Sequence, residues 1–344
     1  MIRVLIIDDS ALVRNVLSQI LGNDPDIEVV GTAPDPFIAR EKIKRLNPDV
    51  LTLDIEMPKM DGITFLQNLM RLRPMPVVMV STLTQHGADA TLRALAIGAV
   101  DYVGKPQANV GESLGDYAEE LVAKVKAAAT SRPRQQAASA PVRIERFAPG
   151  RSRLVLIGAS TGGTQAVREI LEVLPASAPP VVVAQHIPAS FSQPFAERLD
   201  RQCAVRVLEA EDGQRVLPGH VFIAPGDRHL GVGRSGADWI CRVHDGKRVN
   251  RHRPSVDVLF HTAAKHLGPS VIAVLLTGMG DDGARGLKAL RDAGAETMVQ
   301  DEASSVVWGM PGSAVRLGAT DRILPLDQIA AEILKLSAAT RPAR

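Results

Sequence analysis

The chain has 344 residues and a mass of 36.8 kDa, a length at which two domains are expected. Hydrophobic residues make up 45% of it and charged residues 23%, which excludes a largely disordered chain, and a net charge of +2 gives no indication of nucleic-acid binding. Two cysteines, Cys203 and Cys241, are too few for a disulfide framework or a four-thiolate zinc site. No apolar run approaches the roughly 18 residues of a membrane span, and Met1 leads into a strand pattern rather than a signal peptide, so we expect a soluble, cytoplasmic protein.

Charge is unevenly distributed along the chain. Residues 1–126 contain 13 Lys and Arg against 17 Asp and Glu, whereas residues 154–344 contain 21 against 20. Residues 127–153 contain six arginines against one acid, are otherwise rich in Ala, Ser, Gln and Pro, and show no apolar periodicity. This composition is typical of a linker, so we predict an interdomain linker at 127–153 between domains at 1–126 and 154–344.

In the first domain, short β-branched runs alternate with amphipathic stretches. The predicted strands are Val4–Ile7, Ile27–Val30, Val50–Leu53, Val77–Val80 and Val100–Val103, and the helices between them include Ala11–Leu21 and Ile63–Leu72. Continuous apolar strands separated by helices are typical of a parallel sheet that is covered on both faces. We therefore predict a doubly wound α/β domain.

The second domain repeats this alternation and adds an insertion. The predicted parallel strands are Leu154–Ile157, Val181–Ala184, Val271–Leu276 and Glu296–Val299. Between Val205 and Val243, closely spaced strand patterns with Gly and Pro turns indicate an antiparallel insertion. The predicted fold class is thus α/β, with a second doubly wound sheet that is larger and Rossmann-like.

Acidic residues follow two predicted strands of the first domain. Asp8 and Asp9 follow the first strand and Asp54 follows the third, so they are expected to meet at the carboxyl edge of the sheet. Three clustered carboxylates repel one another unless a hard cation such as Mg²⁺ compensates their charge. Lys105 and Ser81, at the ends of the fifth and fourth strands, bring an amine and a hydroxyl to the same edge. Each residue alone fits an ordinary cap or solvated group, but the full set predicts an acidic site for a cation, with a carboxylate that could accept a phosphoryl group.

This pattern resembles the receiver domain of two-component response regulators, a flavodoxin-like fold, over residues 1 to about 126. The matching segments are Asp8-Asp9-Ser10, Leu53-Asp54-Ile55-Glu56-Met57-Pro58 followed by Asp61-Gly62, Ser81-Thr82, and Lys105-Pro106. The resemblance implies that a histidine kinase phosphorylates Asp54, and that Asp8, Asp9 and Asp54 bind Mg²⁺. It also implies that Ser81 and Lys105 contact the phosphate and that Tyr102 is the aromatic switch residue.

A glycine-rich turn, Gly158-Ala159-Ser160-Thr161-Gly162-Gly163, separates a predicted strand from a predicted helix at Thr164–Leu174. Dinucleotide binding requires G-x-G-x-x-G, but Ser160 replaces the middle glycine, and no acid ends the next strand, which disfavours a nicotinamide oxidoreductase. The same segment also fits G-x-S-x-G, in which a serine nucleophile is presented on a sharp turn. We therefore favour Ser160 as a nucleophile over a dinucleotide-binding turn.

A serine nucleophile requires a base and an acid that orients the base. His186 ends the next predicted strand, and Asp281 and Asp282 follow the strand after the insertion, so all lie at one edge of the sheet. The flanking Gly278 and Gly280 allow close approach of the backbone, which makes the amide of Met279 a candidate oxyanion donor. The order Ser, His, Asp differs from that of α/β-hydrolases and predicts another scaffold.

Other histidines and arginines of the second domain allow further interpretations. A metal site could pair His252 with His261 or His266, but no ligand spacing recurs. Arg248 and the run Arg251-His252-Arg253 fit a solvated face, with binding of an acidic substrate surface as the alternative. A non-catalytic, nucleic-acid-binding output domain is disfavoured because residues 154–344 are nearly neutral and contain no recognition-helix module.

Residues 154 to about 338 resemble the catalytic domain of the chemotaxis protein-glutamate methylesterases (CheB type). The matching segments are Gly158–Gly163, Gln185-His186-Ile187-Pro188, Ala224-Pro225-Gly226-Asp227-Arg228-His229, Arg253-Pro254-Ser255-Val256-Asp257, Leu276-Thr277-Gly278-Met279-Gly280-Asp281-Asp282-Gly283 and Gln300-Asp301-Glu302. The resemblance implies a Ser160–His186–Asp282 triad that needs no cofactor. It implies phosphorylation-activated demethylation of γ-glutamyl methyl esters on chemoreceptors, with release of methanol, and deamidation of receptor glutamines. The partners it implies are chemoreceptors and a chemotaxis histidine kinase, with no nucleic acid and with membrane contact only through receptors.

Overall fold

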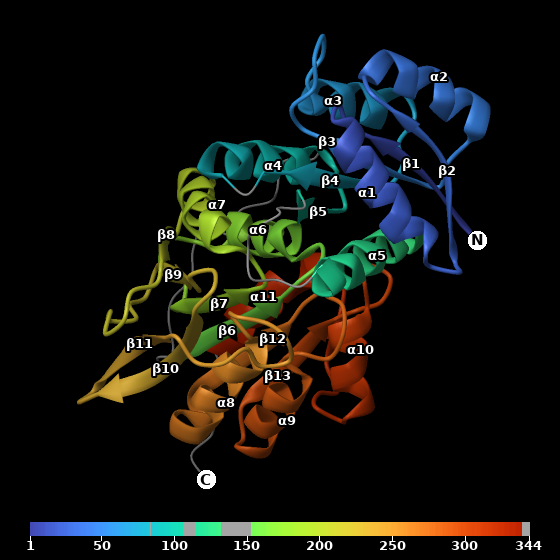
Figure 1. Cartoon of the computed structure of the whole chain (residues 1–344). Helices are drawn as coiled ribbons and strands as arrows, with labels where there is room; N and C mark the ends of the chain where they lie inside the picture. Colours follow the sequence, from blue (N-terminus) through green and yellow to red (C-terminus); the bar gives the residue numbers. More distant parts are fainter. Residues whose placement is uncertain (83, 106–113, 132–152, 339–344) are drawn as a thin grey trace. The chain divides into compact units, whose positions relative to one another are not determined.

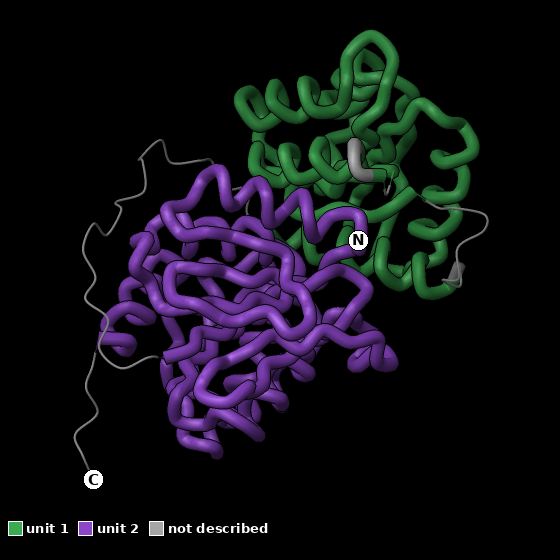
Figure 2. Tube along the Cα trace, turned by 90° about the vertical axis from the view of Figure 1, so that its left-hand side faces the viewer, with its two compact units in different colours: residues 1–138 green, residues 139–344 purple. Residues whose placement is uncertain are grey.

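The structure is a computed structural model, and it describes residues 1–82, 84–105, 114–131 and 153–338. The chain divides into two compact units, Met1–Ala138 and Ser139–Arg344 (Figure 2). Most of the predicted linker, residues 132–152, and Pro106 lie outside the described residues. No helix in the described part of the chain is both long enough and apolar enough to cross a bilayer.

The first unit is built on a five-stranded parallel sheet, as predicted, and its strand order is β2-β1-β3-β4-β5. Its elements are β1 (Ile2–Ile7), α1 (Ala11–Gly22), β2 (Ile27–Ala33), α2 (Pro36–Leu46), β3 (Val50–Asp54), α3 (Gly62–Leu72), β4 (Val77–Ser81), α4 (Gln85–Ile97), β5 (Asp101–Gly104) and α5 (Leu114–Thr130). All residues of β3 and β4 are buried, because the sheet is covered on both faces. Figure 1 shows the helices around this sheet.

Local signals in the sequence explain where the helices of the first unit begin. The Ser10 hydroxyl accepts a hydrogen bond from the amide of Val13, and Asp61 caps α3 in the same way through the amide of Thr64. The Ser10 cap starts α1 directly after β1 and so fixes the loop that contains the first pair of acids.

The last helix of the first unit is longer than expected. It continues through Thr130, four residues into the range predicted for the linker, so the expected start of the linker at 127 is too early. Ala127 and Ala128 are buried, and alanine has the highest helix propensity of all residues. The overall composition of residues 127–153 reflects mainly the residues after Thr130, so it did not indicate that the first residues of this range are helical.

The second unit contains a seven-stranded parallel sheet with the order β14-β13-β12-β6-β7-β9-β8 and a separate antiparallel pair. Its elements are β6 (Leu154–Ala159), α6 (Gly163–Val173), β7 (Val181–Gln185), α7 (Ala189–Gln202), β8 (Arg206–Glu209), β9 (His220–Ile223), β10 (His229–Ser235), β11 (Asp238–His244), α8 (Val256–His266), the 3₁₀ turn η1 (Gly268–Ser270), β12 (Val271–Leu275), α9 (Ala284–Asp292), β13 (Glu296–Gln300), α10 (Gly309–Arg316), β14 (Ile323–Leu324) and α11 (Leu326–Ala338). The direction in which successive strands are added to the sheet reverses at β6. Strands β6, β7 and β12 are buried along their whole length. Helices α6 and α7 lie on one side of the sheet and α8 and α9 on the other (Figure 1).

The predicted antiparallel insertion is present but smaller than expected. Among the described strands, β10 and β11 pair in antiparallel fashion, whereas β8 and β9 extend the main sheet as parallel strands, with β9 lying between β7 and β8. A strand pattern in the sequence does not encode the direction of its partner, because the same alternation suits both pairings. The order places the ends of β6, β7 and β12 next to one another, where ligand sites of parallel sheets form.

Candidate functional site

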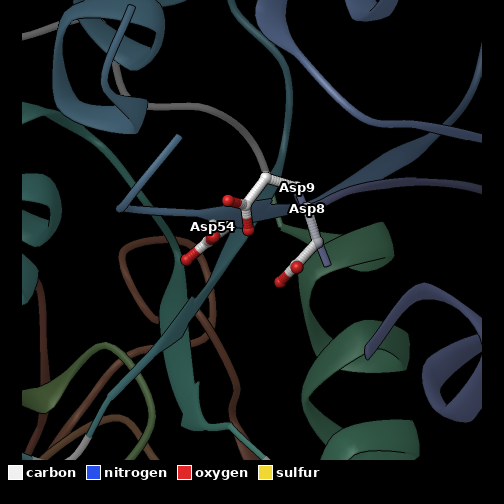
Figure 3. A group of neighbouring side chains, drawn as sticks. All are labelled: Asp8, Asp9 and Asp54. Atoms are coloured by element: carbon white, nitrogen blue, oxygen red, sulfur yellow. The ribbon is translucent and has the colours of Figure 1, made fainter. Parts of the chain in front are cut away.

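Three carboxylates meet at the carboxyl edge of the first sheet. One oxygen each of Asp8, Asp9 and Asp54 lies within 4.8 Å of the others (Figure 3), as the strand ends predicted. Asp8 and Asp54 are buried, whereas Asp9 is exposed. The Oδ2 atom of Asp8 is buried and accepts no hydrogen bond from the described residues. A hard divalent cation fits this group, since it would supply the positive charge that buried carboxylate oxygens need.

Lys105 lies against the same carboxylates. Its Nζ atom is 2.8 Å from Asp54 Oδ2 and 3.5 Å from Asp8 Oδ2. Burial raises the pKa of Asp54 to about 6, although the hydrogen bond from Lys105 lowers it, and the charge of Asp8 adds to the increase. Burial also raises the pKa of Asp8 against the charge of Lys105. One amine therefore does not fully compensate the two buried acids.

The remaining residues predicted for this site occupy the ends of β4 and β5. Ser81 is buried, and its hydroxyl donates to the carbonyl of Thr82 at 3.2 Å. Tyr102 is also buried, which raises the pKa of its phenol, and the Lys124 amine lies 5.0 Å from the centre of its ring. The roles of Ser81, Tyr102 and Lys105 toward a phosphate stay predictions.

The raised pKa of Asp54 has a consequence for stability. An acid whose pKa is 3.8 in the unfolded chain and about 6 in the folded one destabilises the fold when ionised, so the destabilisation is absent below about pH 4 and complete above about pH 6. We expect Asp54→Asn to stabilise the metal-free first unit by up to about 3 kcal/mol at pH 8 and by little at pH 4.5. Urea unfolding in a chelating buffer measures this difference by circular dichroism.

Intrinsic fluorescence separates the two units in that experiment. Both tryptophans, Trp239 and Trp308, lie in the second unit, so a transition seen by circular dichroism but not by tryptophan fluorescence belongs to the first. Asp9→Asn is the matched control, because Asp9 is exposed and its replacement is expected to change stability by less than about 1 kcal/mol. Equal stabilisation at both pH values would contradict the prediction.

Ser160 of the second unit lies in the sharp turn between β6 and α6. The backbone of this turn is held by hydrogen bonds from the Ser160 amide to the Thr277 carbonyl at 3.0 Å and from the Gly163 amide to the Ser160 carbonyl at 2.7 Å. Gly162 has a φ of 75°, a left-handed conformation that favours glycine. The Gln185 side chain donates to the Ser160 carbonyl at 3.0 Å. These contacts hold the serine at the carboxyl edge of the sheet.

His186 lies between Ser160 and Asp282. Its Nδ1 atom is 3.0 Å from Ser160 Oγ, and its Nε2 atom is 2.8 Å from Asp282 Oδ2. Because a carboxylate only accepts hydrogen bonds, Nε2 bears the proton, which leaves Nδ1 free to accept the proton of the serine. The two ring nitrogens have exchanged the places that they occupy in the chymotrypsin triad, where Nε2 faces the serine. The three side chains therefore form one continuous hydrogen-bonded chain from Ser160 through His186 to Asp282.

The structure decides between the two adjacent acids. Asp282 has 1% of its side chain exposed and bonds His186, whereas Asp281 is 60% exposed and lies 4.0 Å from the Arg285 guanidinium. Burial raises the pKa of Asp282, but the hydrogen bond and charge of His186, together with other donors, outweigh it and hold the pKa well below the usual value. Asp282 therefore stays ionised beside His186.

The other donors to Asp282 were not anticipated from the sequence. Its Oδ1 atom accepts from the Asn250 amide at 2.7 Å and from the Ser255 hydroxyl at 2.8 Å, and its Oδ2 atom accepts from the Val256 amide at 2.7 Å. Ser255 and Val256 belong to the segment Arg253–Asp257, which carries part of the family resemblance, and this is the sequence signal that could have identified them. Asn250 lies outside every motif and had none.

Buried His229 supports the same segment. Its Nδ1 atom accepts from the Ser255 amide at 3.2 Å, so its Nε2 atom bears the proton and donates to the Lys247 carbonyl at 2.8 Å. Burial lowers the pKa of His229, in agreement with a neutral ring that holds two loops together.

The backbone at Gly278 lies directly against the serine. A Cβ atom on Gly278 would approach Ser160 Cβ to 2.7 Å, so only glycine allows this contact. The amide of Met279 has no hydrogen-bond partner among the described residues. Its role as an oxyanion donor stays a prediction.

His252 lies directly against His186. The ring of His252 stacks on that of His186 with 3.6 Å between the centres, and in the described part of the second unit no three metal-ligating side chains come together. His252 thus belongs to the surroundings of the triad.

Comparison with known proteins establishes the family of the chain. The CheB methylesterase family model matches residues 155–333, and the response regulator receiver domain model matches residues 4–111. The chain belongs to the CheB methylesterase family. A relative from Xanthomonas campestris pv. campestris, named protein-glutamate methylesterase/protein-glutamine glutaminase 1, is 56% identical, and the match covers 99% of this chain and 98% of the relative.

Further relatives extend this match. A Bordetella parapertussis protein named protein-glutamate methylesterase/protein-glutamine glutaminase is 55% identical, over 97% of this chain and 96% of its own. The crystal structure of the Thermotoga maritima CheB methylesterase catalytic domain is 38% identical, covers 54% of this chain and 100% of that chain, and gives a TM-score of 0.53. The predicted CheB-type family and the α/β fold class are confirmed.

Proposed function

We propose that the chain is a phosphorylation-activated serine hydrolase that demethylates γ-glutamyl methyl esters of chemoreceptors and also deamidates receptor glutamines, in the adaptation step of chemotaxis. The hydrogen-bonded chain Ser160–His186–Asp282 is the observation that supports this best. Relatives 55% to 58% identical are named for both activities. Their names, the receiver model and the triad geometry all agree with this function.

The geometry supports a two-step acyl transfer. Ser160 Oγ attacks the ester carbonyl while His186 Nδ1 accepts its proton, and Asp282 stabilises the resulting imidazolium through Nε2. Backbone amides, including that of Met279, stabilise the oxyanion. The tetrahedral intermediate expels methoxide, which leaves as methanol with the proton from His186. Water then attacks the acyl-enzyme with His186 again as base, and glutamate is released; a glutamine substrate loses ammonia in place of methanol.

Regulation belongs to the first unit. In our proposal a chemotaxis histidine kinase phosphorylates Asp54, and Asp8, Asp9 and Asp54 hold Mg²⁺, which neutralises the phosphoryl charge when bound. Lys105 and Ser81 contact the phosphoryl oxygens. Tyr102 is the aromatic switch residue, whose side chain changes position when Asp54 is phosphorylated. The buried Oδ2 atom of Asp8 and the raised pKa of Asp54 support a site that is completed by a cation. We place the enzyme in the cytoplasm, near the membrane only through its receptors.

Release of methanol from a peptide that contains a γ-glutamyl methyl ester tests this function. We expect the full chain to release methanol, and a small acyl phosphate with Mg²⁺ to raise the rate. A chelator is expected to remove the increase while preserving the basal rate, because only the first unit uses the ion. Absence of methanol under every condition would contradict the hydrolase, and a rate that ignores the phosphodonor would contradict the regulation.

A further inference from the structure

A tight turn beside the triad has a left-handed backbone at both of its central residues. Val249 and His252 exchange backbone hydrogen bonds of 3.1 and 2.9 Å, and Asn250 and Arg251 between them have φ angles of 50° and 67°. Turns with two consecutive positive φ angles favour asparagine or glycine at the first central position. Asn250 therefore suits this backbone, and the turn fixes where its side chain lies.

The Asn250 amide joins two carboxylates. Its nitrogen donates to Asp282 Oδ1 at 2.7 Å and to Asp257 Oδ2 at 2.8 Å. Both partners are carboxylates that accept, so the nitrogen and not the oxygen of the amide faces them, and both of its N–H groups are used.

The two bridged carboxylates are buried close to each other. Asp257 is 4% exposed, and its other oxygen accepts from the Gly286 amide at 2.7 Å. Burial raises the pKa of Asp257, and the charge of Asp282 raises it further, against the hydrogen bonds from Gly286 and Asn250. Two like charges in a buried site repel each other, so a donor that bonds both holds them at a fixed separation.

We propose that Asn250 is a positioning residue of the hydrolase: its amide bridges Asp257 and Asp282 and thereby holds the Asp282 carboxylate in line with His186 Nε2. The inference rests on the function proposed above and adds a residue outside the triad. Without the bridge, Asp282 keeps its donors from the Ser255 hydroxyl and from the amides of Val256 and Asp257, but its charge is repelled by the Asp257 carboxylate. The chemical step should slow, because the imidazolium formed in that step depends on the alignment of Asp282.

Asn250→Gly tests the proposal, because glycine accepts the positive φ and removes only the amide. Asn47→Gly is the matched control, since Asn47 has a φ of 45° at the end of α2, in the other unit. With the full chain and the γ-glutamyl methyl ester peptide, we expect kcat of Asn250→Gly to fall about 10- to 100-fold and KM to stay within about threefold. Asn47→Gly should match the wild type. Asn250→Asp should be slower than Asn250→Gly, since it adds a third carboxylate.

Labelling of Ser160 by a fluorophosphonate separates positioning from folding. For Asn250→Gly we expect the labelling rate to fall with kcat while the final labelled fraction equals that of the wild type. A kcat within about threefold of Asn47→Gly overturns the proposal, as does a loss that appears in KM or in the final labelled fraction. If the wild type releases no methanol, the hydrolase function itself fails; if it releases methanol and Asn250→Gly is fully active, only this inference fails.

Discussion

Ser160→Ala is expected to lower methanol release from the γ-glutamyl methyl ester peptide by on the order of 10⁴-fold or more. In the proposed mechanism the serine oxygen forms the acyl-enzyme, and no other hydroxyl is hydrogen-bonded to His186 Nδ1 among the described residues. The turn between β6 and α6 is held by backbone bonds that alanine keeps, so thermal stability should change by less than about 1 kcal/mol. Quantification of methanol with a matched melting curve measures both effects.

Two controls accompany that substitution. A fluorophosphonate should add to Ser160 in the wild type, located by mass spectrometry, and should leave the alanine variant unlabelled. Phosphorylation of Asp54 by a small acyl phosphate should be unchanged, because Ser160 belongs to the other unit. Retained methanol release or an adduct on a different residue would show that the nucleophile has been assigned wrongly.

Asp282→Asn is the second substitution with a large expected effect. The two carboxylate oxygens accept from donors on both sides, so an amide group places N–H against N–H in either orientation. If the new amide donates to His186 Nε2, the proton moves to Nδ1, which then no longer accepts the proton of Ser160. We expect kcat to fall about 10⁴-fold and the second unit to lose about 3 kcal/mol of stability.

Asp281→Asn is the matched control for this change, because it makes the same replacement at the adjacent, 60% exposed position. It should alter stability by no more than about 0.5 kcal/mol and leave kcat near that of the wild type. The pKa of Asp282 is lowered by folding, so its stabilisation is present above the unfolded pKa near 3.9 and lost as the pH falls below it. The stability difference between wild type and Asp282→Asn should therefore shrink in acid. A similar loss in both variants would mean that the acid has been misassigned.

Much of the first site follows from sequence because it depends on strand ends. Asp8 and Lys105 directly follow strands and Asp54 is the last residue of β3, and the carboxyl ends of neighbouring parallel strands meet at one edge. The same logic brought Ser160 and His186 together at the ends of β6 and β7. The roles of these residues in phosphoryl and acyl transfer remain predictions for the experiments above.

Pairing direction and the start of the linker could not be predicted in the same way. The strand patterns at β8 and β9 fit an antiparallel insertion as well as they fit a parallel sheet. The pairing of β9 with both β7 and β8 shows that the two strands belong to the parallel sheet. The alanines at the end of α5 have the same composition as the predicted linker that follows them. The burial of Ala127 and Ala128 shows that they pack in the first unit. Both errors concern partners distant in the sequence.

By itself, the sequence determined the two α/β domains, the acidic group of the first and the serine and histidine of the second, because apolar periodicity and strand-end placement are local properties of the chain. Strand-end placement left Asp281 and Asp282 both possible, and the family resemblance named Asp282, which the structure places against His186. Only the tertiary structure decided that Nδ1 is the nitrogen beside Ser160 and that Asn250 bridges two buried acids. Adjacent residues point in different directions once a turn is formed, and burial and hydrogen-bond partners arise from segments far apart in the sequence. Those partners set which groups are charged and where their protons lie.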